Sequence, residues 1–322
     1  MQDINTTTSR SLLGSALTLL YPGQCCTRAL YSLKGQRTIT GRSLELHAGF
    51  PLVSEVHARE KKRCSSLPDC HDMRWESTFG SLVIRTGTDK ITDGMNEAGL
   101  VVNALYAEQG ACTCSDDREP SHWPTALAQY LLDTCSTVKQ AIKALRTAPL
   151  RRFTRADNAL EHDRIALSDS SGDSVVIELN NGKWHAFHGK NCQILTPSPV
   201  FSEHLKLAEY LGKLQNALGN SGFKTPEQSA LQAAFGYRML ANNLPAEAAA
   251  LISTAAVFSV IASTSAPMPP QADSTLPTRK RWHGVADQTT RSFYVENTSN
   301  NALIHIPFAG IDFTRESSTP LP

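Results

Sequence analysis

Strand-like and helix-like segments occur in separate blocks along this 322-residue chain. Runs rich in β-branched and aromatic residues predict strands at 26–33, 37–46, 79–86, 100–106, 164–168, 174–179, 183–188, 192–195, 282–287, 292–296 and 302–306. Apolar residues that recur every three or four positions predict helices at 123–133, 137–145, 201–217, 226–242 and 246–255. This block order favours the stacked layers of an α+β fold over a parallel βαβ fold.

Turn residues define how these segments connect. Lys34-Gly35-Gln36 separates the first two predicted strands, which indicates a β-hairpin. The stretch 93–99 is rich in turn residues and is expected to lead into the strand at 100–106. Residues 47–78, 108–122 and 263–278 are expected to be loops.

The composition limits the kind of partner. With 41% hydrophobic and 19% charged residues, the chain matches a soluble globular protein and not a disordered one. A formal net charge of +1 gives no reason to expect nucleic acid or an anionic membrane as partner. No segment approaches the roughly 20 apolar residues that a membrane-spanning helix needs.

The cysteines do not indicate a metal site. None of the eight cysteines forms a C-x2-C pair, and His185 and His188 have no converging partners in the sequence, so we expect neither metal nor cofactor. Cys64 and Cys70 are the most plausible disulfide pair, and only in an oxidising compartment.

Residues 1–25 resemble a secretory leader. Arg10 precedes the short apolar run Leu12–Leu20, and Pro22-Gly23 ends it. We expect this leader to be removed, which leaves residues 26–322 as a single domain in a periplasmic or secreted protein. A cytoplasmic protein with an N-terminal extension is the alternative.

From residue 26 onward the sequence resembles the choloylglycine hydrolase family, which includes bile salt hydrolases, penicillin V acylases and Gram-negative relatives that cleave acyl-homoserine lactones. The segments that carry the resemblance are Cys26-Thr27-Arg28, Gly41-Arg42-Ser43-Leu44-Glu45, Thr92-Asp93-Gly94-Met95-Asn96-Glu97-Ala98-Gly99-Leu100, 167–174 and 195–201. The resemblance implies a four-layer αββα sandwich of the N-terminal nucleophile hydrolases, and a homo-oligomer that is often a tetramer.

The chemistry that the resemblance implies is hydrolysis of a non-peptide carbon–nitrogen bond. The substrate would be a small-molecule amide, an N-acyl conjugate of the penicillin V, conjugated bile salt or acyl-homoserine lactone type. Such an enzyme uses one N-terminal cysteine for both thiol and free amine. The amine, with a reference pKa of about 7.7–8.0, takes the thiol proton and the thiolate forms an acyl-enzyme.

Register decides which cysteine is the nucleophile. The family's active-site arginine follows the nucleophile by sixteen positions, and Arg42 follows Cys26 by that number. Counting from Cys25 would shift the strand by one residue and turn every side chain to the other face. Cys26 is therefore favoured over Cys25, with Arg42 beside its thiol to favour the thiolate.

Several other site positions depart from the family pattern. Glu45 stands where the family has the Asp that orients the α-amine, and Tyr106 stands at the backbone oxyanion donor. Pro197 replaces the Asn that supplies the second oxyanion donor, and proline offers neither a side-chain donor nor an N–H. The family's later active-site arginine aligns with Ser229, and the next arginine is Arg238.

These departures leave a second hypothesis open. Losing one oxyanion donor typically costs roughly 100- to 1000-fold in turnover. The alternative to an active amidase is therefore a catalytically degenerate homologue that retains a ligand pocket.

Overall fold

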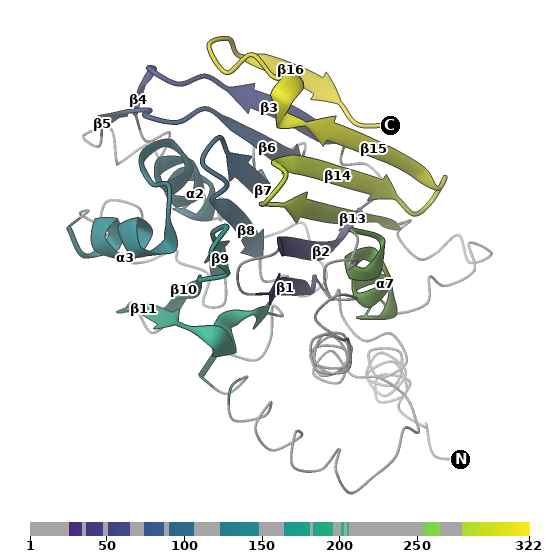
Figure 1. Cartoon of the computed structure of the whole chain (residues 1–322), viewed down its shortest axis with the longest axis horizontal. Coiled ribbons are helices and arrows are strands. Elements are labelled where there is room, and N and C mark those ends of the chain that lie inside the picture. Colours follow the sequence, from purple (N-terminus) through teal and green to yellow (C-terminus); the bar gives the residue numbers. More distant parts are fainter. Residues whose placement is uncertain are drawn as a thin grey trace, which may run out of the picture.

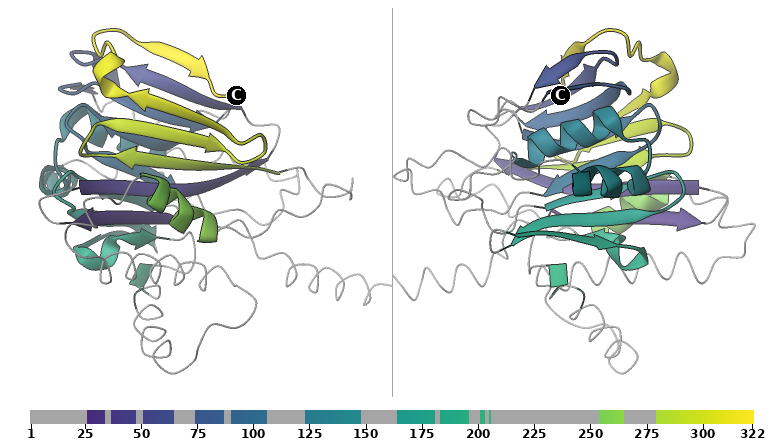
Figure 2. Two further views of the ribbon diagram at one scale, coloured as in Figure 1. Left: turned by 45° about the vertical axis from the view of Figure 1, so that its right-hand side comes forward. Right: turned by 90° about the vertical axis from the view of Figure 1, so that its left-hand side faces the viewer.

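The chain folds into two large antiparallel sheets with helices on their outer faces, as seen in a computed structural model (Figures 1 and 2). The structure describes residues 26–33, 37–47, 51–64, 74–86, 90–105, 123–147, 164–180, 183–195, 201–202, 205, 254–264 and 279–322.

The first sheet has six strands, in the order β12-β1-β2-β13-β14-β15. Their bounds are β12 Ile194–Leu195, β1 Arg28–Leu33, β2 Arg37–His47, β13 Arg279–Asp287, β14 Ser292–Asn297 and β15 Ala302–Pro307. Strands from the two ends of the described chain therefore lie side by side, with β2 paired to β13 over nine residues from Arg279↔His47 to Asp287↔Ile39 (Figure 1).

The second sheet has eight strands, in the order β11-β10-β9-β8-β7-β6-β3-β16. Their bounds are β11 Lys183–His188, β10 Ser174–Asn180, β9 Arg164–Ser168, β8 Val101–Leu105, β7 Lys90–Asn96, β6 Ser81–Thr86, β3 Leu52–His57 and β16 Ser317–Pro320. A separate hairpin joins β4 Lys62–Cys64 to β5 Arg74–Glu76.

Three apolar clusters define the layers. The central cluster combines inward-facing residues of both sheets, for example Leu44 and Trp282 of the six-stranded sheet with Met95 and Val176 of the eight-stranded sheet. The outer face of the eight-stranded sheet packs against α2 Trp123–Thr134 and α3 Val138–Thr147. The outer face of the six-stranded sheet packs against α7 Thr254–Thr264. The order α-β-β-α confirms the expected four-layer fold (Figure 2).

Local sequence explains how two of the helices are placed. The Thr137 hydroxyl accepts a hydrogen bond from the Gln140 N–H at 3.2 Å, which caps the first turn of α3. Gly41 lets α7 approach β2 closely, because a Cβ there would lie 2.5 Å from Val257 Cγ1 and 2.8 Å from Ile261 Cγ1. A larger residue at this position would require α7 or these two side chains to shift.

Most predicted elements are confirmed, including the hairpin of β1 and β2. The prediction for 93–99 is wrong in part, because Asp93 to Asn96 belong to β7 and the turn begins at Glu97. The loop expected at 47–78 contains β3, β4 and β5. The helix α7 extends beyond the helix predicted at 246–255 as far as Thr264, so the loop prediction is wrong at residues 263 and 264. Apart from residues 201–202 and 205, the predicted helices at 201–217 and 226–242 lie outside the described residues.

None of the helices in the described segments is long and apolar enough to cross a membrane.

Candidate active site

Cys26 lies two residues before β1, and its side chain belongs to the apolar cluster between the two sheets. Its side chain is buried, with 8% of its surface exposed. One backbone and one side-chain contact join the next residue, Thr27, to β2. The Thr27 N–H donates to Ser43 Oγ at 2.9 Å, and the Ser43 N–H donates to the Thr27 carbonyl at 2.9 Å. These contacts hold Thr27, the residue after Cys26, against β2.

Arg42 lies on the same inward face. Arg28 pairs directly with Arg42, and Cys26 is two residues before Arg28, so strand alternation puts all three residues on one side of the sheet. Arg42 Nη1 donates to Asp93 Oδ2 at 3.1 Å and also to the Thr92 carbonyl. Its guanidinium is almost fully buried, so β7 of the opposite sheet holds the cation in place.

The pKa of Arg42 reflects its interaction with the Cys26 thiol. Burial lowers the pKa of the guanidinium, but Asp93 and the Cys26 side chain more than offset this, so the pKa of Arg42 is raised above its ordinary value. Arg42 is hydrogen-bonded to the side chains of both Asp93 and Cys26. A stable cation hydrogen-bonded to a thiol favours the thiolate.

The structure describes only part of the predicted site. It brings together Cys26 and Arg42, while Glu45 is placed by its backbone in β2, opposite Arg281 of β13. Tyr106 and Pro197 lie outside the described residues, as do Cys25, Ser229 and Arg238. The roles predicted for these positions stay predictions.

A buried polar network extends this site, and sequence analysis did not predict it. Asn103 Nδ2 donates to Asp93 Oδ1 at 2.7 Å, and Arg28 Nε donates to Asn103 Oδ1 at 3.3 Å. Arg28 Nη1 also donates to the Cys192 carbonyl at 2.7 Å and to Ser174 Oγ at 3.1 Å. The available signal was a polar residue inside an apolar strand pattern, at Asn103 in Val101–Leu105.

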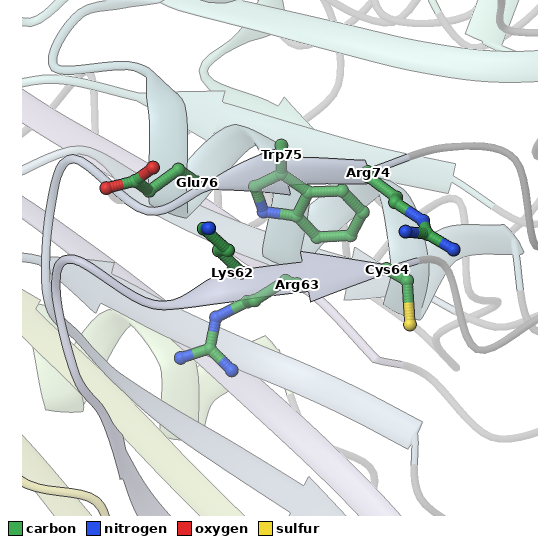
Figure 3. A pocket seen from close by; sticks show the side chains of 6 residues that line it. All are labelled: Lys62, Arg63, Cys64, Arg74, Trp75 and Glu76. Atoms are coloured by element: carbon green, nitrogen blue, oxygen red, sulfur yellow. The ribbon is translucent and has the colours of Figure 1, made fainter.

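Other parts of the described chain do not form a competing catalytic or metal site. A pocket of about 430 Å³ lies on the β4–β5 hairpin, lined by Lys62, Arg63, Cys64, Arg74, Trp75 and Glu76 (Figure 3). Its lining includes neither Cys26 nor Arg42. Among the described residues no group of three or more His, Cys, Asp and Glu side chains has the geometry to hold a metal ion. Cys64 is free and exposed, and its proposed partner Cys70 lies outside the described residues.

Known proteins resemble this chain over nearly its whole length. A penicillin V acylase from Pectobacterium atrosepticum is 28% identical over 327 aligned positions, which cover 94% of this chain and 84% of that protein. The solved penicillin V acylase from Agrobacterium tumefaciens superposes with a TM-score of 0.70 at 27% identity, covering 90% of this chain and 88% of that one.

A more distant structure shares the fold. A variant of the conjugated bile acid hydrolase from Clostridium perfringens superposes with a TM-score of 0.68 at 18% identity, covering 92% of this chain and 96% of that one. The family model for linear amide C–N hydrolases of the choloylglycine hydrolase family matches residues 26–313. The chain therefore belongs to the choloylglycine hydrolase family and is a hydrolase of linear, non-peptide carbon–nitrogen bonds.

Proposed function

We propose that the mature protein begins at Cys26 and that this residue is the nucleophile of a cysteine amidase. The observation that carries the proposal is the buried contact between the Cys26 side chain and Arg42, with Arg42 held by Asp93. A cation fixed beside a thiol favours the thiolate, which is the nucleophilic form. Removal of residues 1–25 would give Cys26 the free α-amine that serves as its base.

The reaction follows from these groups. The neutral α-amine takes the Cys26 proton, and the sulfur attacks the amide carbonyl carbon to form a tetrahedral intermediate. The carbon–nitrogen bond then breaks, the leaving amine takes the proton from the α-ammonium group, and the acyl group stays on sulfur as a thioester. Water attacks the thioester and releases the acid, with the amine again acting as base. Glu45 is the proposed partner that orients the amine.

Oxyanion stabilisation would come from residues near the thiol. The Tyr106 backbone N–H is the proposed first donor, and Pro197 stands at the position of the second. A donor of this kind lowers the barrier because it is already oriented when charge develops.

The substrate class is an N-acyl conjugate with an apolar acyl or aryl group. Two relatives that cover most of this chain at 27% and 28% identity are penicillin V acylases, so penicillin V is the first substrate to test. A glycine-conjugated bile salt and a long-chain acyl-homoserine lactone follow. The leader supports a periplasmic or secreted location, and the family resemblance supports a homo-oligomer, with a tetramer expected in light scattering.

The decisive experiment combines intact mass with turnover. We expect the purified protein to lack residues 1–25 and to hydrolyse at least one of the three substrates, with the Cys26→Ala variant inactive on it. A mature chain that begins at Cys25 and is active would contradict the assignment of the nucleophile. A processed protein that hydrolyses none of the three substrates would favour the alternative, a catalytically degenerate homologue.

Thiol labelling at neutral pH gives a readout that does not depend on the substrate. Burial raises the pKa of the Cys192 thiol to about 11 and also raises the pKa of Cys135, so neither thiol competes for an alkylating reagent. Exposed Cys64 does compete, and labelling is therefore measured in a Cys64→Ser background. The modified peptide is identified by mass, which separates Cys26 from Cys70, Cys112 and Cys114 outside the described residues. Rapid and selective labelling of Cys26 is expected.

A further inference from the structure

Asn103 is a buried amide at the centre of an otherwise apolar strand, β8. It is 3% exposed, and its side chain points toward the six-stranded sheet, where it meets Arg28. Its register partner is Asp93 of β7, and these two residues face the register pair Arg28 and Arg42 of the other sheet. A buried polar residue needs hydrogen-bond partners, so its contacts indicate what it does there.

Each of the two arginines bonds one member of the facing pair. Arg42 Nη1 donates to Asp93 Oδ2 at 3.1 Å, and Arg28 Nε donates to Asn103 Oδ1 at 3.3 Å. The Asn103 amide completes the set, because its Nδ2 donates to Asp93 Oδ1 at 2.7 Å. A guanidinium only donates and a carboxylate only accepts, whereas an amide does both. Asparagine at this position can therefore join Arg28 to Asp93, and the bond from Arg28 directs the amide N–H groups toward Asp93.

The bond from Asn103 fixes the plane of the Asp93 carboxylate. The terminal torsion of an aspartate is broad, so contact through a single oxygen leaves the carboxylate free to turn. Asn103 holds Oδ1 while Arg42 holds Oδ2, and the described residues supply Oδ1 with no other donor. Without the amide, a buried carboxylate oxygen would lose its hydrogen bond, which is costly. The carboxylate would turn toward another donor, and Arg42 would move with it.

We propose that Asn103 is a positioning residue of the active site, which fixes the Asp93 carboxylate and thereby holds the Arg42 guanidinium against the Cys26 side chain. Arg42 is hydrogen-bonded to the side chains of both Asp93 and Cys26, so a displacement at Asp93 changes the contact with the thiol. Errors of about 1 Å in the position of an active-site group can cost on the order of 100-fold in rate. The inference rests on the proposed function, because it assumes that Cys26 reacts as a thiolate beside Arg42.

Substitution of Asn103 tests position without changing charge. An Asp93→Asn variant would remove a negative charge near the thiol as well as the contact that orients Arg42, and these two effects on thiol ionisation oppose each other. Asn103→Leu leaves the charged and titratable groups of the neighbouring elements in place. They include Arg28, Asp93, Asp173, Cys192, the ion pair of Arg164 with Glu178 and the α-amine of the mature protein.

The test measures the alkylation rate of Cys26 as a function of pH in the mature Cys64→Ser protein, with Asn103→Leu or Asn103→Ser added. Leucine is similar in size to asparagine but bonds neither partner, and serine is too short to bond both. For Asn103→Leu we expect the midpoint of the profile to rise by about 0.5–1 pH unit, with labelling at pH 7 about three- to tenfold slower, because a displaced Arg42 stabilises the thiolate less. Asn103→Ser should shift the midpoint in the same direction by a smaller amount.

Gln129→Leu is the matched control, because α2 carries the same kind of contact outside the active site. Gln129 Nε2 donates to Asp133 Oδ1 at 2.7 Å, and Asp133 Oδ2 pairs with Arg63 Nε at 3.1 Å. These are the same two distances as between the amide, carboxylate and guanidinium of the active site. The control should lose stability in urea unfolding but keep the pH profile of the parent protein, which separates a loss of stability from a change in position.

The inference is overturned if Asn103→Leu folds and its profile coincides with that of the parent, or if Gln129→Leu shifts the midpoint equally. If urea unfolding shows that Asn103→Leu does not fold, Asn103→Ser decides by the same criterion, and failure of both variants to fold also overturns the inference. An unreactive Cys26 in the parent protein, with none of the three substrates hydrolysed, would mean that the proposed function fails and the inference with it. A reactive parent with an unchanged Asn103→Leu profile would mean that only the inference fails.

Discussion

Arg42 is positioned by a carboxylate from the opposite sheet, not by its neighbours in the chain. Asp93 accepts hydrogen bonds from Arg42 on one oxygen and from Asn103 on the other, and all three side chains are buried. A guanidinium on a strand would otherwise have several rotamers available. The ion pair selects the Arg42 rotamer that lies beside Cys26. Asp93 of β7 therefore influences the chemistry of Cys26.

Replacement of Asp93 by Asn tests this pair. The variant keeps the shape of the side chain but leaves Arg42 as a buried cation without its counterion, so we expect the free energy of unfolding to fall by about 3 kcal/mol. Urea denaturation measures the change. Asp312→Asn is the control, because Asp312 and Arg315 form an ion pair that is largely exposed to solvent, and it should change the stability little. Equal losses in the two variants would mean that the buried pair contributes no more than a surface pair.

At the level of elements, the contact between β2 and α7 decides how the nucleophile's sheet is covered. Gly41 is next to Arg42 and points to the opposite face, toward Val257 and Ile261 of α7. The same strand therefore carries the site on one face and the helix contact on the other. A displacement of α7 is expected to shift Arg42 as well, because Gly41, which contacts α7, and Arg42 are adjacent residues of one strand.

Gly41→Ala should therefore be costly. The added methyl group meets Val257 and Ile261 at less than normal contact distance, so α7 must shift, and we expect a loss of about 1–3 kcal/mol in the free energy of unfolding. Gly310→Ala is the matched control, since a Cβ at Gly310 has no heavy atom within 4 Å. Thermal and urea unfolding of both variants measure the difference. A Gly41→Ala protein as stable as the control would show that α7 adapts freely.

Element prediction succeeded where the pattern was local and failed where it was not. The strands β9 and β11 have the predicted bounds, because alternating apolar residues and clear turns mark them. The strands β4 and β5 have three residues each and contain mostly charged residues, so no periodic pattern marks them. They form because Trp75 Nε1 donates to Asp133 Oδ2 of α2 at 2.6 Å, which is a tertiary contact.

On the scale of the whole molecule, the two sheets share one core. Inward-facing residues of both sheets belong to a single cluster, and the buried polar network crosses the same interface. Neither sheet can expose its inward face without disrupting both the apolar cluster and the polar network. Because the two sheets share this core, we expect them to unfold together.

Urea unfolding of the mature protein should accordingly show one transition. Tryptophan fluorescence, to which Trp282 of the six-stranded sheet contributes, and far-UV circular dichroism, which reports on both sheets, should give the same midpoint. Two separated transitions would contradict a single domain over residues 26–322. A Trp282→Phe variant keeps the fluorescence of the other tryptophans and tests whether they report the same midpoint.

The sequence by itself determined the family, the layered fold and the spacing that puts Cys26 and Arg42 on one face. The family and its four-layer fold follow from the motifs that resemble the choloylglycine hydrolases, and the common face of Cys26 and Arg42 follows from the register of a local hairpin. Both signals extend over short separations along the chain. The tertiary structure alone decided which groups surround that pair. Asp93 meets Arg42 across 51 positions and Asn103 meets Arg28 across 75, between strands of different sheets. Such contacts depend on how two sheets pack over the whole core, and no local pattern encodes that packing.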